Sequence, residues 1–168
     1  MSQRQILFHL ALGLMIAATV TPAGAHALAS NGNSPESRIV GTWHMSVSVG
    51  SCIDPSAPPN NFFALNTFHA GGTLSDTNTF PTTARGPGQG VWSYDPRTRQ
   101  YTAHMNFMRF VNGAFDGLQD ATTTMSLEGN ARFLHGAIHA WMRNVDGSVR
   151  AELCGQVEAE RMGIDYQP

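Results

Sequence analysis

The strongest constraint on the fold is a series of short segments in which apolar and polar residues alternate. In residues 40–49, Trp43, Met45, Val47 and Val49 fall on one face, and polar residues fall on the other. This period of two predicts a half-buried β-strand. Seven further segments of this kind follow, at residues 62–69, 73–78, 90–94, 100–111, 118–127, 132–143 and 148–161. No segment has a helical period with caps, so the sequence predicts an all-β, eight-stranded, antiparallel up-and-down arrangement.

The lengths of the connections indicate how the strands are assembled. In an up-and-down arrangement, successive connections alternate between the two ends. Three connections at one end are short (Gly-Gly, Asp-Pro-Arg-Thr and Glu-Gly-Asn). At the other end, residues 50–61, 79–89 and 112–117 form longer connections. The connection between the seventh and eighth segments is the only tight one at that end. We therefore expect a barrel with one closed end and one mouth, where function usually lies.

The N-terminal residues have the composition of an export signal. Arg4 precedes an apolar run over residues 6–20 that is too short to span a bilayer, and small residues follow it. We predict a signal peptide over residues 1–25, a disordered lead-in over residues 26–38, the barrel over residues 39–163 and a tail over residues 164–168. The mature protein is then secreted or periplasmic, with no membrane span after cleavage.

The two cysteines fit this prediction. An even number of cysteines in an exported chain indicates a disulfide. When the barrel closes, the first strand pairs with the last, and Cys52 and Cys154 both fall near the mouth beside that seam. A bridge there would enclose about a hundred residues and stabilise the fold by roughly 4–5 kcal/mol.

Charge and composition exclude several functions. All ten basic residues of the 168-residue chain are arginine, and the net charge is −2. Because the chain has no basic stripe, we expect no nucleic-acid partner. Without lysine, Schiff-base chemistry is excluded. Hydrolase signatures such as the nucleophile elbow are also missing from the sequence.

Gly41-Thr42-Trp43 on the first strand and Arg161 at the end of the last resemble the corresponding positions of lipocalins and the wider calycin barrels. The resemblance implies that Trp43 plugs the closed end and that Arg161 packs across its ring. The chain also departs from this pattern. Gly90-Val91-Trp92 repeats the triplet, and too few residues follow Arg161 for the C-terminal helix of classical lipocalins. The run from Phe63 to Gly72, followed by this second triplet, is similar to small exported bacterial lipocalin-like proteins.

The fifth segment suggests a ligand site. One of its faces carries Tyr101, Met105, Phe107 and Arg109. If this face points inward, Arg109 would orient a carboxylate or a polarised oxygen of an apolar ligand; the alternative is that it extends to the rim. In residues 132–143 both faces contain apolar residues, so alternation does not show which face lines the lumen. The predicted ligand contacts are Phe63, Leu65, Trp92, Tyr101, Met105, Phe107, Arg109, His139 and Trp141.

His135 and His139 have a spacing that could bind zinc on a helix. On a strand they are about 13 Å apart, so we predict no metal site. A single histidine could hold haem, but there is no motif for covalent attachment, and we predict no cofactor.

We expect the barrel to bind a small, mostly hydrophobic molecule. One alternative is a cyclase or isomerase that uses the same cavity, with His104, Arg109 and His139 as candidate catalytic residues. Another is a protein-interaction or inhibitor module that uses the long loops. The sequence does not indicate the oligomeric state.

Overall fold

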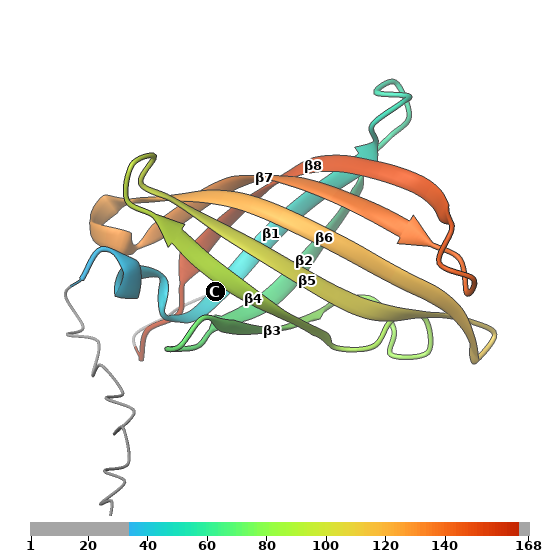
Figure 1. Ribbon diagram of the computed structural model, residues 1–168, viewed down its shortest axis with the longest axis horizontal. Coiled ribbons are helices and arrows are strands. Elements are labelled where there is room, and N and C mark those ends of the chain that lie inside the picture. The colour runs from blue at the N-terminus through green and yellow to red at the C-terminus, as the bar shows by residue number, and fades with distance from the viewer. Residues whose placement is uncertain (1–33, 165–168) are drawn as a thin grey trace, which may run out of the picture.

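The computed structural model describes residues 34–164. The predicted signal peptide, residues 26–33 of the predicted lead-in and residues 165–168 of the predicted tail lie outside them. Eight antiparallel strands form one closed barrel, in the order in which they occur in the chain (Figure 1). The strands are β1 (Gly41–Ser51), β2 (Asn60–Phe68), β3 (Thr73–Asn78), β4 (Gly88–Asp95), β5 (Gln100–Val111), β6 (Ala114–Glu128), β7 (Phe133–Arg143) and β8 (Val149–Arg161). The predicted fold class is therefore confirmed. Among residues 34–164, no helix is long and apolar enough to cross a membrane.

Two short 3₁₀ helices lie at one end of the barrel (Figure 1). They are η1 (Glu36–Ile39), which precedes β1, and η2 (Gly129–Ala131), which connects β6 to β7. Residues 36–38 belong to the segment predicted as a disordered lead-in, but here they form part of η1. The side chain of Ile39 is fully buried against the barrel. η1 therefore covers the end at which the short connections lie.

The closed end is built around Trp43, which has no exposed surface. Its indole Nε1 donates a hydrogen bond of 2.9 Å to Ile39 O. The Arg161 guanidinium lies 4.3 Å from the centroid of the Trp43 ring and donates to the carbonyls of Ala131, Val40 and Arg38. Burial lowers the pKa of Arg161 from its usual value. The contact expected between Trp43 and Arg161 is thus present, and it ties β1, β8 and both 3₁₀ helices together.

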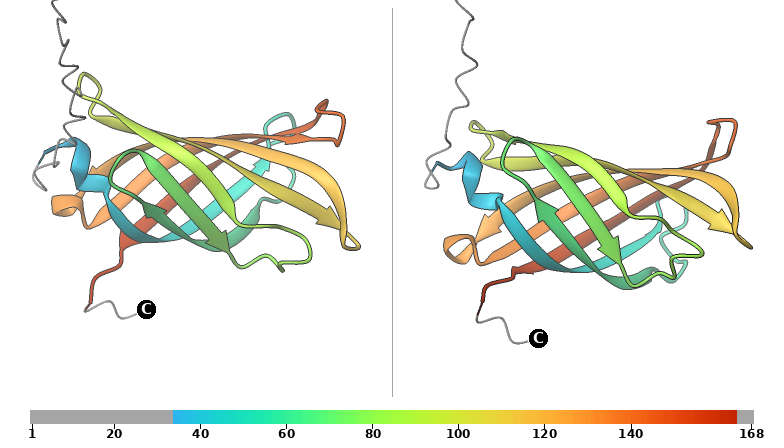
Figure 2. Two further views of the ribbon diagram at one scale, coloured as in Figure 1. Left: turned by 60° about the horizontal axis from the view of Figure 1, so that its bottom comes forward. Right: turned by 90° about the horizontal axis from the view of Figure 1, so that it is seen from below.

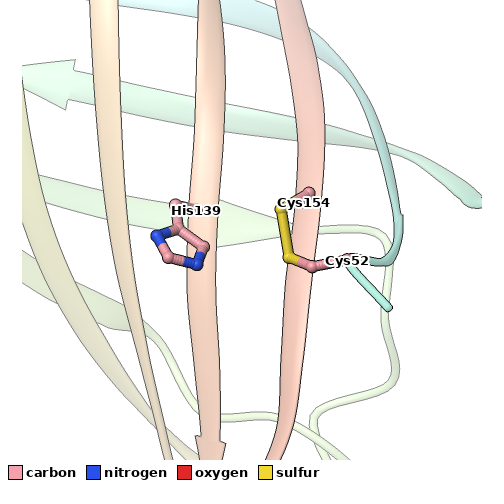
Figure 3. Close-up of side chains that lie close together, drawn as sticks. All are labelled: Cys52, His139 and Cys154. Carbon is pink, nitrogen blue, oxygen red and sulfur yellow. A yellow bond between two sulfur atoms is a disulfide. The ribbon is translucent and has the colours of Figure 1, made fainter. Parts of the chain in front are cut away.

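The seam between β1 and β8 carries the disulfide. The two strands pair antiparallel, with Gly50 opposite Cys154. Cys52 and Cys154 are bonded, with their Cα atoms 4.9 Å apart, as the sequence predicted. Figure 3 shows the bond beside His139 of β7. Cys154 is exposed, so the bridge lies on the outer surface of the barrel near the open end.

One predicted connection is wrong. Residues 112–117 were expected to form a long loop at the mouth, but β5 and β6 are joined by only two residues, Asn112 and Gly113. Both have positive φ values, 51° and 79°, which is typical of a tight hairpin turn. The mouth is therefore framed by two long loops, residues 52–59 and 79–87, and by two tight hairpins. Figure 2 shows these connections at the end opposite to η1.

Candidate functional site

The barrel encloses a cavity of about 280 Å³ that lies above Trp43 and opens toward the mouth. Its wall is mostly apolar and comes from all strands except β4, together with the loop of residues 79–87. On β5 the lining residues are Ala103, Met105, Phe107 and Arg109. The face of β5 that carries Arg109 therefore points inward, because successive side chains of a strand alternate between the two sides.

A buried ion pair lies in the cavity wall. Asp76 of β3 is 4% exposed and Arg85 of the loop of residues 79–87 is 8% exposed. Arg85 Nη2 donates to both carboxylate oxygens of Asp76, at 2.9 and 3.1 Å. The guanidinium also lies 3.7 Å from the centroid of the Phe107 ring, which is close enough for a cation–π interaction. Burial raises the pKa of Asp76, and the charge of Arg85 opposes that rise.

Gly88 makes room for this pair. It is the first residue of β4 and lies opposite Asp76 in the β3–β4 ladder. A Cβ atom at Gly88 would lie 3.0 Å from Asp76 Cβ and 3.4 Å from Arg85 Nη2. Any larger residue would therefore push the carboxylate or the guanidinium out of its present position.

Backbone hydrogen bonds hold Arg85 in place. The loop before β4 forms an isolated antiparallel bridge with the end of β5, in which Arg85 lies opposite Arg109. Gly86 N donates to Met108 O and Phe110 N donates to Ala84 O, both at 2.9 Å. Because directly opposed residues of a ladder project to the same side, both arginines border the cavity.

Arg109 is part of a second charged group. It donates to Asp116 of β6, and its side chain is 12% exposed. Arg150 of β8 holds the same carboxylate through two bonds of 2.9 and 3.0 Å. The hydrogen bonds from Arg150, followed by the nearby positive charges, lower the pKa of Asp116. Arg109 is therefore not a side chain that extends freely into solvent.

Three buried polar atoms of the cavity wall have no hydrogen-bond partner within residues 34–164. They are Asn66 Oδ1, Arg85 Nε and Arg109 Nη1. A buried polar atom without a partner costs about 1–3 kcal/mol, and native proteins contain few of them. All three belong to residues that line the same cavity. This coincidence makes the polar part of the cavity the candidate functional site.

The structure corrects four of the predicted ligand contacts. Phe63 and Leu65 project to the outer surface of β2, because the inward face of that strand carries Phe62, Ala64 and Asn66. His139 and Trp141 project outward from β7, where the other face, Ile138, Ala140 and Met142, lines the cavity.

The other five predicted contacts are inside the barrel. Met105, Phe107 and Arg109 line the cavity. Trp92 and Tyr101 are buried beneath it, at the closed end. The Trp92 indole donates to His69 O at 3.1 Å, and the Tyr101 hydroxyl donates to Pro35 O. These two residues are therefore part of the floor.

Two of the three candidate catalytic residues are outside the cavity. His104 lies on the outer face of β5, where its Nδ1 is 2.9 Å from Thr122 Oγ1. His139 contacts Glu152 and the Trp141 ring on the outer face of β7. Only Arg109 lines the cavity. Among the described residues, the charged side chains of its wall are Asp76, Arg85 and Arg109.

His139 also lies beside the disulfide, and its imidazole and the two sulfur atoms are within 4.8 Å of one another (Figure 3). Both sulfur atoms are used in the disulfide, so this group offers no thiolate to a metal.

Sequence reasoning did not identify Asn66, Asp76 and Arg85. For Asn66 and Asp76 the sequence pattern contained a signal. Asn66 has the same strand parity as Ala64 and Phe68, and Asp76 has the same parity as Leu74, so each is a polar residue on an otherwise apolar face. Arg85 lies in a loop, where no period applies.

Fold and site together define a class: a closed antiparallel β-barrel, sealed at one end, with a mostly apolar cavity that carries buried charge. No protein-family model and no curated protein matches the sequence.

Proposed function

We propose that this protein is an exported, lipocalin-like barrel that binds a small, mostly hydrophobic molecule in its lumen. The observation that carries the proposal is the cavity itself, about 280 Å³ of space lined mainly by apolar side chains. Cores of folded proteins are normally close-packed, so a barrel filled by its own side chains would not leave such a space. Ligand sites are typically concave, mostly apolar and equipped with a few polar groups.

The rest of the barrel supports this function. Trp43, Arg161 and η1 seal one end, so the cavity has a floor. The disulfide supports export to an oxidising compartment, where such bonds persist. The resemblance to lipocalins, based on Gly41, Trp43 and Arg161, is consistent with a carrier.

Native mass spectrometry of the mature protein, purified from its own host, tests the proposal. We expect a co-purifying small molecule of reproducible mass. The Ala121→Phe variant is the control, because Ala121 lines the cavity and a phenyl ring there would occupy the space. This variant should lose the molecule. A clean apo mass for the natural protein across preparations would contradict the proposal.

The same cavity supports a second candidate function, a cyclase or isomerase, and Asp76 is the observation that favours it. A buried carboxylate with a raised pKa is typical of a general acid or base. The test is to incubate the protein with the co-purified molecule and to follow it by NMR. Rearrangement without a change of mass, abolished in Asp76→Asn, would support an enzyme, and an unchanged spectrum would argue for a carrier.

A further inference from the structure

We propose that the ligand is a small monocarboxylate amphiphile, whose carboxylate lies between Arg85 and Arg109 while its apolar part fills the barrel. This inference rests on the proposed binding function and specifies the chemical class of the ligand. It is carried by the unpartnered donor atoms of the two arginines, by the balance of charge around them and by the apolar remainder of the wall.

The first donor is Arg85 Nε. The other nitrogens of this guanidinium are committed, since Nη2 binds both oxygens of Asp76 and Nη1 donates to Gly86 O at 3.3 Å. The face of the group is covered by Phe107. Nε is the buried nitrogen of this guanidinium that has no acceptor at all within residues 34–164, and the residue is 8% exposed. These contacts leave Arg85 a buried donor, Nε, that is available to a ligand.

The second donor is Arg109 Nη1. Nη2 of the same group donates to Asp116, and Nη1 has no acceptor within residues 34–164. Arg85 and Arg109 are directly opposed in an antiparallel bridge, where Cβ atoms are about 4.5–5.5 Å apart. Two donors on adjacent arginines suit a group with two acceptor oxygens. A carboxylate provides this in its most compact form, and small rotations of the two side chains would direct both donors at it.

The charges favour an anion with a single negative charge. The connected side chains are Asp76 with Arg85, and Asp116 with Arg109 and Arg150. Three guanidinium groups face two carboxylates, which leaves one positive charge in excess. A monocarboxylate would neutralise it, whereas an amine would increase it and an alcohol would leave it unchanged.

The size and the wall of the cavity define the rest of the molecule. A volume of about 280 Å³ equals that of about nine liquid water molecules, so it suits a ligand on the order of ten non-hydrogen atoms. Away from the arginines, the wall includes Met45, Val47, Phe62, Met125 and Ile138. Octanoic acid has a suitable size and chemistry and serves as the probe.

Isothermal titration calorimetry with octanoate, n-octanol and n-octylamine tests the inference at neutral pH. We expect octanoate to bind most tightly, octanol more weakly and octylamine least. Arg109→Met should reduce octanoate affinity about tenfold to a hundredfold, the range for hydrogen bonds to charged groups, and should change octanol affinity by less than about threefold. This variant leaves Asp116 paired with Arg150, so its fold should be intact.

Arg132→Met is the matched control. It removes the same charge from an arginine that also pairs with a carboxylate, Glu160, on the outer surface. Its octanoate affinity should equal that of the natural protein. Equal affinities for octanoate and octanol, or an Arg109→Met variant that binds octanoate as well as the control, would overturn the carboxylate inference and leave the binding function standing. Failure of all three probes, together with a clean apo mass, would overturn both.

Discussion

Removal of the disulfide should cost this protein a large share of its stability. The bond between Cys52 and Cys154 closes a ring across 102 residues of sequence. In the chain-entropy description, a crosslink over about 100 residues stabilises the fold by about 4.7 kcal/mol at 25 °C, because it restricts the unfolded chain. The net free energy of unfolding of a folded domain is only about 5–15 kcal/mol, so the contribution of this one bond is a large fraction of it.

The double variant Cys52→Ala/Cys154→Ala tests this expectation. The alanines keep the backbone hydrogen bond from Cys52 N to Glu152 O, and the disulfide lies on the outer surface, so the folded barrel should change little. We expect urea unfolding, followed by tryptophan fluorescence, to show a loss of about 4–5 kcal/mol. At about 3 °C per kcal/mol, the melting temperature should fall by about 14 °C.

The natural protein, unfolded in the presence of a reductant, is the matched control. It should lose the same free energy, because it lacks the crosslink but keeps both sulfur atoms. A loss below about 1 kcal/mol in both samples would refute the reasoning, since it would mean that the unfolded chain is already restricted without the bond. A loss in the double variant alone would assign the effect to the substitutions.

Three further predictions concern the closed end, the mouth and the cavity. Arg161→Ala should lower the free energy of unfolding by about 3 kcal/mol in urea titration, because a cation–π contact and three bonds to carbonyls are lost. Arg132→Ala should cost less than about 1 kcal/mol, and equal losses would contradict the role of Arg161. Asp116 has a folded-state pKa below its usual 3.8, so its stabilising effect is present above that value and is lost as the pH falls through the folded pKa. The stability advantage of the natural protein over Asp116→Asn, measured by urea titration, should therefore shrink as the pH falls below 3.8, and a difference that stays constant would contradict this prediction. Ala121→Phe should abolish binding of octanoate in calorimetry while the melting temperature changes by only a few degrees, and retained affinity would show that the ligand lies elsewhere.

The strands were predictable because burial on one face imposes a period of two. Trp43, Met45, Val47 and Val49 alternate with polar residues, and all four are buried. The resulting β1 places Cys52 beside β8, so the disulfide followed from the same reasoning. Where the two faces differ in polarity, alternation fixes both the strand and its orientation.

The orientation of β7 was not predictable, because both of its faces carry large apolar residues. Trp141 projects outward beside His139, where its ring packs on the imidazole. The cavity face, which consists of Ile138, Ala140 and Met142, has no polar residue that distinguishes it. The ion pair of Asp76 and Arg85 was harder to predict than the orientation of β7, because Arg85 lies in a loop and the two residues meet only in the folded barrel.

The short length of β4 has a consequence for the rim of the barrel. This strand has eight residues and pairs with the twelve-residue β5 only as far as Asn106, so the end of β5 would lack a neighbour on this side if residues 84–86 did not add to the sheet there. The segment that completes the sheet also carries Arg85. Any movement of this segment away from β5 would break two backbone hydrogen bonds and withdraw the counter-charge of the buried Asp76. The buried ion pair therefore stabilises the contact of this segment with β5, and amide exchange at Gly86 and Phe110 would measure how often the segment separates from β5.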